Sequence, residues 1–142
     1  SRQVAGSHGV PVVADLMFGE VDFGSADLLV LPGGTVRLNE LEGLKQLLLA
    51  AHRQGKLIAA ICAAPMVLGG LGILKGRKAT CYPGFEKYLT GATLETDKPV
   101  VTDGNIVTGR GPALTFAFAL TLVALLAGQG KRSEVASGLL LE

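Results

Sequence analysis

The chain has 142 residues, 49% of them apolar and 18% charged, which suits one domain with a hydrophobic core and excludes a disordered tail. Thirteen basic residues against twelve acidic ones leave a net charge of +1, so neither nucleic acid nor an anionic membrane is an expected partner. Two cysteines are too few for a disulfide framework, and a reducing cytoplasm is the expected compartment.

The first part of the chain alternates between predicted strands and helices. Residues 10–14 form a short extended candidate, in which Pro11 favours an edge strand. Residues 27–31 (DLLVL) are almost continuously apolar and end at Pro32-Gly33-Gly34, as expected of a strand buried on both faces in a parallel sheet.

Leucines at helical spacing predict a helix over residues 38–53, with Asn39 as its N-cap and Gly55 just beyond its C-cap. Residues 57–61 (LIAAI) then predict a second buried strand, and residues 63–71 a helix of small residues.

The later elements complete the predicted α/β domain. Two β-rich runs around Asp103-Gly104 indicate a hairpin over residues 99–109. The longest apolar run, residues 113–126, is shorter than the ~20 residues that span a bilayer, so a buried helix from Pro112 is expected. The remaining predictions are an extended stretch at 78–81, short helices at 85–89 and 133–141, and helix stops at Gly128 and Gly130.

Cys62 stands where the predicted strand 57–61 becomes a helix, in the sequence LIAAICAAP. Such a residue lies at the carboxyl edge of a parallel sheet, where open α/β folds bind ligands. The N–H groups and positive end of a following helix stabilise a thiolate and can hold a developing oxyanion, as at the nucleophile elbow of hydrolases. The small residues Ala63 and Ala64 would let a substrate approach. The alternative is that Cys62 is a small buried hydrophobe, as many free cysteines are.

The Gly33-Gly34 turn follows the preceding buried strand and adds a second feature at the same sheet edge. Two glycines allow positive φ and close backbone approach, so this turn is a candidate for a second oxyanion N–H opposite that of Ala63. An ordinary tight strand-to-helix loop is the alternative.

Several segments together resemble the ThiJ/PfpI superfamily, and within it the branch of the Parkinsonism-linked deglycase and its bacterial homologues. The segments are LLVLPGG (28–34), LIAAICAAP (57–65), ATCYPGFE (79–86), VVTDGNIVTGRGP (100–112) and EVASGLLL (134–141), preceded by GSHGVPVVAD (6–15). Their order over nearly the whole chain matches the family. The resemblance implies a single domain over 1–142 with a flavodoxin-like α/β sandwich, a mostly parallel sheet and an inserted β-hairpin. It also implies a homodimer.

The resemblance further implies a cysteine-dependent glyoxalase or deglycase without metal or organic cofactor. Cys62 would be the reactive cysteine, with the backbone N–H groups of Gly34 and Ala63 as oxyanion donors. The substrates would be small α-oxoaldehydes such as methylglyoxal, or their adducts. The alternative is a non-enzymatic redox sensor or chaperone that uses the same cysteine. A peptidase would need a Cys–His pair, and no histidine stands in the required place.

The sequence departs from the family at its start. The family opens with a β-α unit, of roughly 30–40 residues by the size of such an element, that is not present here. That unit carries the acidic residue that hydrogen-bonds the cysteine sulfur and moves the proton. We therefore expect a fragment, a proteolysed product or a missing companion segment, since no acidic residue of this chain stands out as a replacement.

Four other residues are candidates around the site. Tyr82 replaces a histidine of many relatives, and would either donate a hydrogen bond to a substrate oxygen or pack against Pro83. His8 matches a segment that reaches the partner's active site across the family dimer, so it would contact substrate or simply occupy a loop. Arg110 would either bond carbonyls to fix the turn before the last long helix or bind anions. Cys81 would be a buried thiol near Cys62, or its resolving partner under oxidation.

Overall fold

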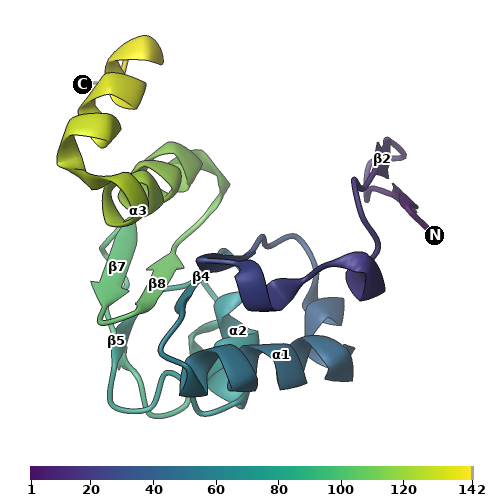
Figure 1. The fold of residues 1–142 in the computed structure, drawn as a ribbon. Helices are drawn as coiled ribbons and strands as arrows, with labels where there is room; N and C mark the ends of the chain where they lie inside the picture. The colour runs from purple at the N-terminus through teal and green to yellow at the C-terminus, as the bar shows by residue number, and fades with distance from the viewer. Residues whose placement is uncertain (142) are drawn as a thin grey trace.

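The computed structural model describes residues 1–141 and has a four-stranded sheet at its centre (Figure 1). The strands lie in the order β3 (Leu28–Leu31), β4 (Leu57–Ile61), β8 (Ile106–Gly109) and β7 (Val100–Asp103). The first three are parallel, and β7 pairs antiparallel with β8. The predictions of two parallel strands and of a hairpin are therefore confirmed. Burial on both faces holds for β4 but not for β3, an edge strand whose Val30 is exposed.

Both faces of the sheet pack against helices, which explains why β4 is apolar throughout. Helices α1 (Glu42–Arg53) and α2 (Pro65–Gly70) cover one face, where alternate strand residues such as Ile58 and Ala60 join the larger core. On the other face, Ala59, Ile61 and Val107 pack with Phe118 and Leu122 of α3 (Thr115–Gly138). This arrangement is the expected flavodoxin-like α/β sandwich.

The β7–β8 hairpin is fastened to a second, two-stranded parallel sheet made of β5 (Lys78–Ala79) and β6 (Thr93–Leu94). The Asp103 carboxylate accepts a hydrogen bond from the Lys78 N–H at 2.8 Å, and Arg77 donates to the Asp103 carbonyl at 3.0 Å. Gly104 supplies the positive φ of 59° that the hairpin turn requires. These contacts hold the strand that leads to Cys81 against the main sheet.

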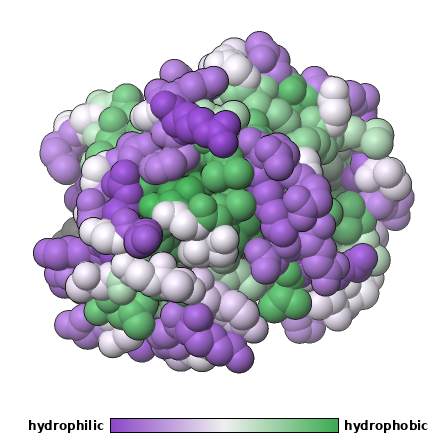
Figure 2. Space-filling model, turned by 90° about the horizontal axis from the view of Figure 1, so that it is seen from below, coloured by the Kyte–Doolittle hydropathy of each residue, from purple (hydrophilic) through white to green (hydrophobic). Residues whose placement is uncertain are grey.

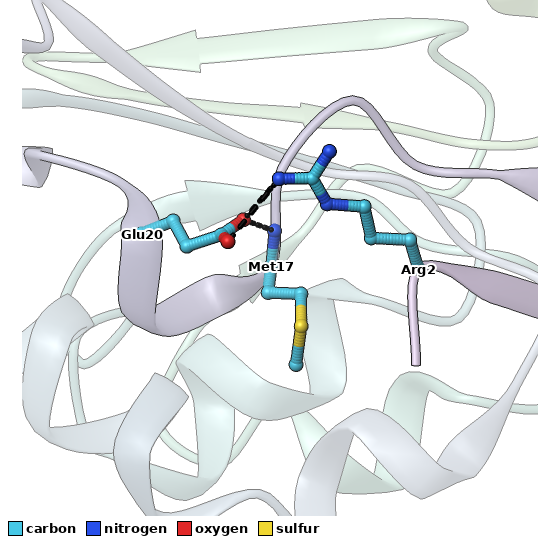
Figure 3. A network of polar contacts seen from close by, with 3 residues as sticks. All are labelled: Arg2, Met17 and Glu20. Carbon is cyan, nitrogen blue, oxygen red and sulfur yellow. Dashed lines mark hydrogen bonds and ion pairs between the residues drawn. The ribbon is translucent and has the colours of Figure 1, made fainter.

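The N-terminal arm is an antiparallel hairpin of β1 (Gln3–Ala5) and β2 (Pro11–Val13), and it stands apart from the body of the fold in Figure 1. At its base, the Glu20 carboxylate accepts hydrogen bonds from Arg2 and from the Met17 backbone N–H at 2.7 Å (Figure 3). The extended prediction for 10–14 is confirmed in β2, whereas β1 was not predicted.

The segment between the arm and β3 contains two 3₁₀ helices, Phe18–Glu20 and Phe23–Ser25. Lys56, just before β4, fastens this segment to the sheet. Its ammonium group donates hydrogen bonds to the carbonyls of Phe23, Gly24 and Ala26, at 2.6 to 3.1 Å.

The start of the first long helix differs from the prediction. The chain first forms a 3₁₀ helix, Val36–Glu40, with Thr35 at its N-cap. The Thr35 hydroxyl accepts a hydrogen bond from the Arg37 N–H at 3.1 Å. Helix α1 then begins at Glu42 with Leu41 at the N-cap, so the prediction of Asn39 as N-cap is wrong. At the other end, Gly55 has φ 70° and follows the C-cap, as predicted.

Other predicted elements are shorter or joined. The helix expected at 63–71 is α2, Pro65–Gly70, and the one expected at 85–89 is a 3₁₀ helix, Glu86–Tyr88. The extended stretch expected at 78–81 pairs as a strand only over Lys78–Ala79. A 3₁₀ turn, Pro112–Leu114, leads into α3, whose backbone leaves helical geometry at Gly128. Gly128 therefore interrupts the helix as predicted, but Gly130 lies within helix.

Residues Pro112–Gly138 are long and apolar enough to cross a membrane by length and composition. The backbone break at Gly128, with φ 87° and ψ 168°, divides this segment, and its first half buries Phe118 and Leu122 against the sheet. The helix thus covers the sheet with one face only. Phe116, Leu125 and Leu126 are exposed, so the prediction of a buried helix holds for that face and not for the whole helix. On the opposite side of the molecule, the surface seen from below carries an apolar area bordered by polar side chains (Figure 2).

Candidate active site at the strand-to-helix turn

Cys62 lies between β4 and α2 with a positive φ of 65°, in the left-handed region that residues other than glycine rarely adopt. Backbone strain of this kind gathers at functional sites and persists where neighbouring contacts enforce it. Two hydrogen bonds do so here. The Cys62 N–H donates to the Gly109 carbonyl, and the Cys62 carbonyl accepts from the Tyr82 N–H, both at 2.9 Å. The thiol is half-buried.

The turn after β3 packs directly on Cys62. A Cβ atom at Gly33 would lie 2.5 Å from the Cys62 Cβ and 3.2 Å from its sulfur, so only glycine fits there. Gly34 follows with φ 95°, which brings a second backbone segment to the same edge of the sheet. The two glycines thus serve different purposes, close approach at the first and positive φ at the second.

The backbone N–H groups of Gly34 and Ala63 are both without a hydrogen-bond acceptor among residues 1–141. By contrast, the next amide along the turn, that of Ala64, donates to the Ile61 carbonyl at 3.2 Å. Unpaired amides on two segments that meet at a half-buried thiol are what an oxyanion site requires.

Tyr82 and Arg110 lie on two segments that flank Cys62. Tyr82 bonds the Cys62 carbonyl through its own amide, and Arg110 follows Gly109, which accepts the Cys62 N–H. Both residues border a mostly apolar cavity of about 200 Å³ whose remaining wall is formed by Pro83 and residues 111–114. The Arg110 guanidinium donates no hydrogen bond and forms no ion pair within residues 1–141, so the predicted carbonyl-bonding role is not seen within this chain.

His8 does not lie at this site within one chain. It stands in the exposed turn of the β1–β2 hairpin, with its Nδ1 3.1 Å from the Ser7 hydroxyl. Its neighbours Gly6 and Ser7 do line a cleft of about 660 Å³ together with Gly33 and Gly34. The arm and the glycine turn thus border the same cleft, but His8 is not part of its wall.

Cys81 is a second free thiol close to the site, and it is 4% exposed. Burial raises the pKa of Cys81 to about 12, with smaller contributions from the charges of Glu86 and Cys62. Cys81 belongs to the core under α1 and α2, whereas Cys62 packs toward the α3 face. The thiol therefore stays protonated at neutral pH, and it lies in the opposite layer from Cys62.

Glu86 is a further residue near the site that was not predicted from the sequence. Its carboxylate accepts the Gly84 N–H at 2.7 Å and lies close enough to Cys81 to influence the pKa of that thiol. The only available signal was its place in the ATCYPGFE motif. Within the described chain, no group of three or more His, Cys, Asp and Glu side chains is arranged to hold a metal ion.

Comparison with known proteins places this geometry in a family. The model of the DJ-1/PfpI family matches residues 1–125. A DJ-1 homologue of Arabidopsis thaliana (homolog B) is 40% identical over 94% of the chain, which spans only 32% of that relative's length. A protein of Pyrococcus horikoshii named as a deglycase is 42% identical over 87% of the chain and 76% of its own length.

A solved structure gives the same result. The crystal structure of Drosophila melanogaster DJ-1beta superposes with a TM-score of 0.92 and 38% identity, over 99% of this chain and 78% of that one. The fold, the order of the motifs and the matched residues agree. The chain belongs to the DJ-1/PfpI family.

Proposed function

We propose that the chain carries the nucleophilic site of a cysteine-dependent glyoxalase or deglycase that acts on small α-oxoaldehydes or their adducts. The observation that carries this proposal is the strained Cys62, clamped by Gly109 and Tyr82 beside two unpaired backbone N–H groups. Relatives named as deglycases support the reaction class.

In the proposed reaction the Cys62 thiolate attacks the aldehyde carbon and forms a hemithioacetal. The C–S bond forms as the carbonyl electrons move to oxygen, where the N–H groups of Gly34 and Ala63 would stabilise the charge. A proton then moves from the former aldehyde carbon to the neighbouring ketone carbon through an enediol. Water releases the hydroxy acid and regenerates the thiolate. The aldehyde carbon is oxidised and the ketone carbon is reduced, so no external oxidant is needed.

The proton transfer needs an acid–base group. No side chain of residues 1–141 hydrogen-bonds the Cys62 sulfur. The family resemblance assigns this role to an acidic residue in a β-α unit that residues 1–142 do not contain.

We place Tyr82, Arg110 and His8 as substrate contacts, with His8 acting across a homodimer. The exposed Val4, Val12 and Val13 of the arm would be covered by that second copy. We also propose that the protein is cytoplasmic and that its reaction uses no cofactor.

The test is methylglyoxal consumption by the purified protein and by Cys62→Ala, with Cys81→Ala as the matched loss of a thiol. We expect Cys62→Ala to abolish the activity and Cys81→Ala to retain it. Unchanged consumption by Cys62→Ala would refute the enzyme proposal.

A redox sensor is the second candidate, because one half-buried thiol lies near another that stays protonated. Mild peroxide would then add two oxygens to Cys62 alone. Selective oxidation together with methylglyoxal turnover no faster than that of free thiols would favour the sensor over the enzyme.

A further inference from the structure

Thr80 and Thr108 are the buried polar residues of the core within residues 1–141, and each is 1% exposed. Thr108 stands in β8, whose four residues are all buried, and valine would have the same shape there without a polar group to satisfy. The Thr108 Oγ1 accepts the Thr80 backbone N–H at 3.0 Å. The hydroxyl therefore satisfies a buried amide that valine would leave without a partner.

The two residues joined by this bond stand next to the two backbone groups that clamp Cys62. Thr108 directly precedes Gly109, whose carbonyl accepts the Cys62 N–H at 2.9 Å. Thr80 stands two residues before Tyr82, whose N–H donates to the Cys62 carbonyl at the same distance. The three hydrogen bonds thus link the end of β4, the end of β8 and residues 80–82 into one closed ring.

Residues 80–82 lie beyond the paired residues of β5, so they need other contacts to hold them. Cys81 is buried in the core, but apolar burial is non-directional and does not set the position of a neighbouring amide. The Tyr82 side chain is 44% exposed and anchors the segment only weakly. The position of the Tyr82 N–H opposite the Cys62 carbonyl therefore depends on the bond that the Thr80 amide makes two residues earlier.

The turn at Cys62 needs such support. Its φ of 65° costs free energy of the same order as one or two hydrogen bonds, so the turn relaxes unless its neighbours hold it. We propose that Thr108 is a positioning residue for Cys62: its hydroxyl fixes residues 80–82 against β8, which keeps the Tyr82 N–H on the Cys62 carbonyl and holds the turn in its left-handed conformation. Its bearing on catalysis rests on the proposed function, whereas the positioning itself is tested without turnover.

Hydrogen exchange followed by NMR tests the positioning at the amides of Cys62 and Tyr82. Thr108→Val keeps the shape of the side chain and removes the acceptor. We expect exchange at these two amides to become about tenfold faster relative to that at Ile58, whose N–H bonds the Asn105 carbonyl at the opposite end of β4. A merely structural role would raise all three rates together, and an unchanged ratio would overturn the proposal.

Thr80→Val is the matched control. The Thr80 hydroxyl is as buried as that of Thr108 and has no hydrogen-bond partner within residues 1–141, and the variant keeps the backbone N–H. It should retain slow exchange at both amides. Thr108→Ser keeps an accepting oxygen and should restore the protection that Thr108→Val loses. An equal loss of protection in Thr80→Val would show that side-chain packing, and not the hydrogen bond, holds the turn.

A measurement on the unmodified protein covers the case in which Thr108→Val does not fold. Exchange at sub-denaturing urea concentrations should give the amides of Thr80, Cys62 and Tyr82 one common dependence on urea, different from that of Ile58, because the ring opens as one unit. Separate dependences, or a common one that Ile58 shares, would overturn the proposal.

Turnover then shows whether the positioning serves the proposed reaction. Thr108→Val should lower kcat for methylglyoxal about tenfold and leave KM nearly unchanged, since a residue that is 1% exposed does not touch substrate. A change in KM alone would contradict the positioning role. Failure of the enzyme proposal is distinguishable, because it is read from methylglyoxal consumption by Cys62→Ala and leaves the exchange results unaffected.

Discussion

Gly33 lies directly against Cys62, so closely that a Cβ atom at position 33 would be 2.5 Å from the Cys62 Cβ and 2.9 Å from the Ile61 carbonyl oxygen. Two adjacent parallel strands, β3 and β4, end at this contact. The position of the thiol is therefore set by the neighbouring strand as well as by its own strained backbone.

Replacement of Gly33 by alanine should disturb both stability and the thiol. The added methyl group meets backbone and a Cβ, which cannot move aside as the end of a flexible side chain can, so we expect a loss of about 1–3 kcal/mol in the free energy of unfolding. Alkylation of Cys62 by iodoacetamide should change in rate as well. Urea denaturation and peptide mass spectrometry measure the two effects.

Gly130→Ala is the control for that substitution, since position 130 lies in α3 with open space around it and no positive φ. Alanine there should raise stability by up to about 1 kcal/mol, because glycine is a poor helix former. Equal effects at the two positions would contradict the packing argument.

The sequence was sufficient for elements whose signal is local. Residues 57–61 are continuously apolar because a central parallel strand is covered on both faces, and Asp103-Gly104 marks a hairpin in any context. Residues 28–31 carry the same apolar signal, but β3 is an edge strand and leaves Val30 exposed. Asn39 is not an N-cap because it lies inside a 3₁₀ helix, Val36–Glu40, which Thr35 caps. Helix α1 begins only after it, at Glu42.

The site could be predicted only in part, for a related reason. Cys62 was found because a strand-to-helix turn is visible in the sequence. The contact with Gly33 and the hydrogen bonds from Gly109 and Tyr82 depend on strand order, which local patterns do not specify. The influence of Glu86 on Cys81 likewise arises from tertiary structure alone.

Gly69 should tolerate no side chain, although it lies in a helix where alanine is usually favourable. A Cβ there would lie 2.2 Å from the Tyr88 carbonyl oxygen, and α2 packs against the 3₁₀ helix that contains Tyr88. We expect Gly69→Ala to cost about 3 kcal/mol through forced separation of the two elements. Thermal and urea denaturation would show it.

The neighbouring Gly70→Ala provides the comparison within the same helix. Its Cβ would find only the Asn39 side-chain oxygen, at 3.8 Å, so this variant should be neutral or more stable. Destabilisation of similar size at both glycines would show that helix α2, and not the Tyr88 contact, is the sensitive feature.

The hydroxyl of Thr108 should be needed for the stability of the fold. Its Oγ1 accepts the backbone N–H of Thr80 at 3.0 Å, and both residues are 1% exposed. Thr108→Val keeps the shape but leaves that amide unsatisfied, which should cost about 1–3 kcal/mol in the free energy of unfolding. Thr102→Val, on the exposed side of β7, should have little effect in the same urea titration. A small change at Thr108 would mean that the Thr80 amide finds another acceptor.

Cys81 should make the fold sensitive to alkaline pH. Its pKa is raised from 9.0 to about 12 in the folded protein, chiefly by burial, so the unfolded chain loses this proton first as the pH rises. The stability that the protonated Cys81 thiol contributes is complete below pH 9. It is lost as the pH rises toward 12, at up to about 1.4 kcal/mol per pH unit. Cys81→Ala lacks this ionisation while all other groups titrate as before. Urea titrations at pH 8 to 11 give the free energy of unfolding of both proteins. Above pH 9 the unmodified protein should lose stability relative to Cys81→Ala. A difference that stays constant over this range would show that the Cys81 thiol ionises as easily in the folded protein as in the unfolded chain.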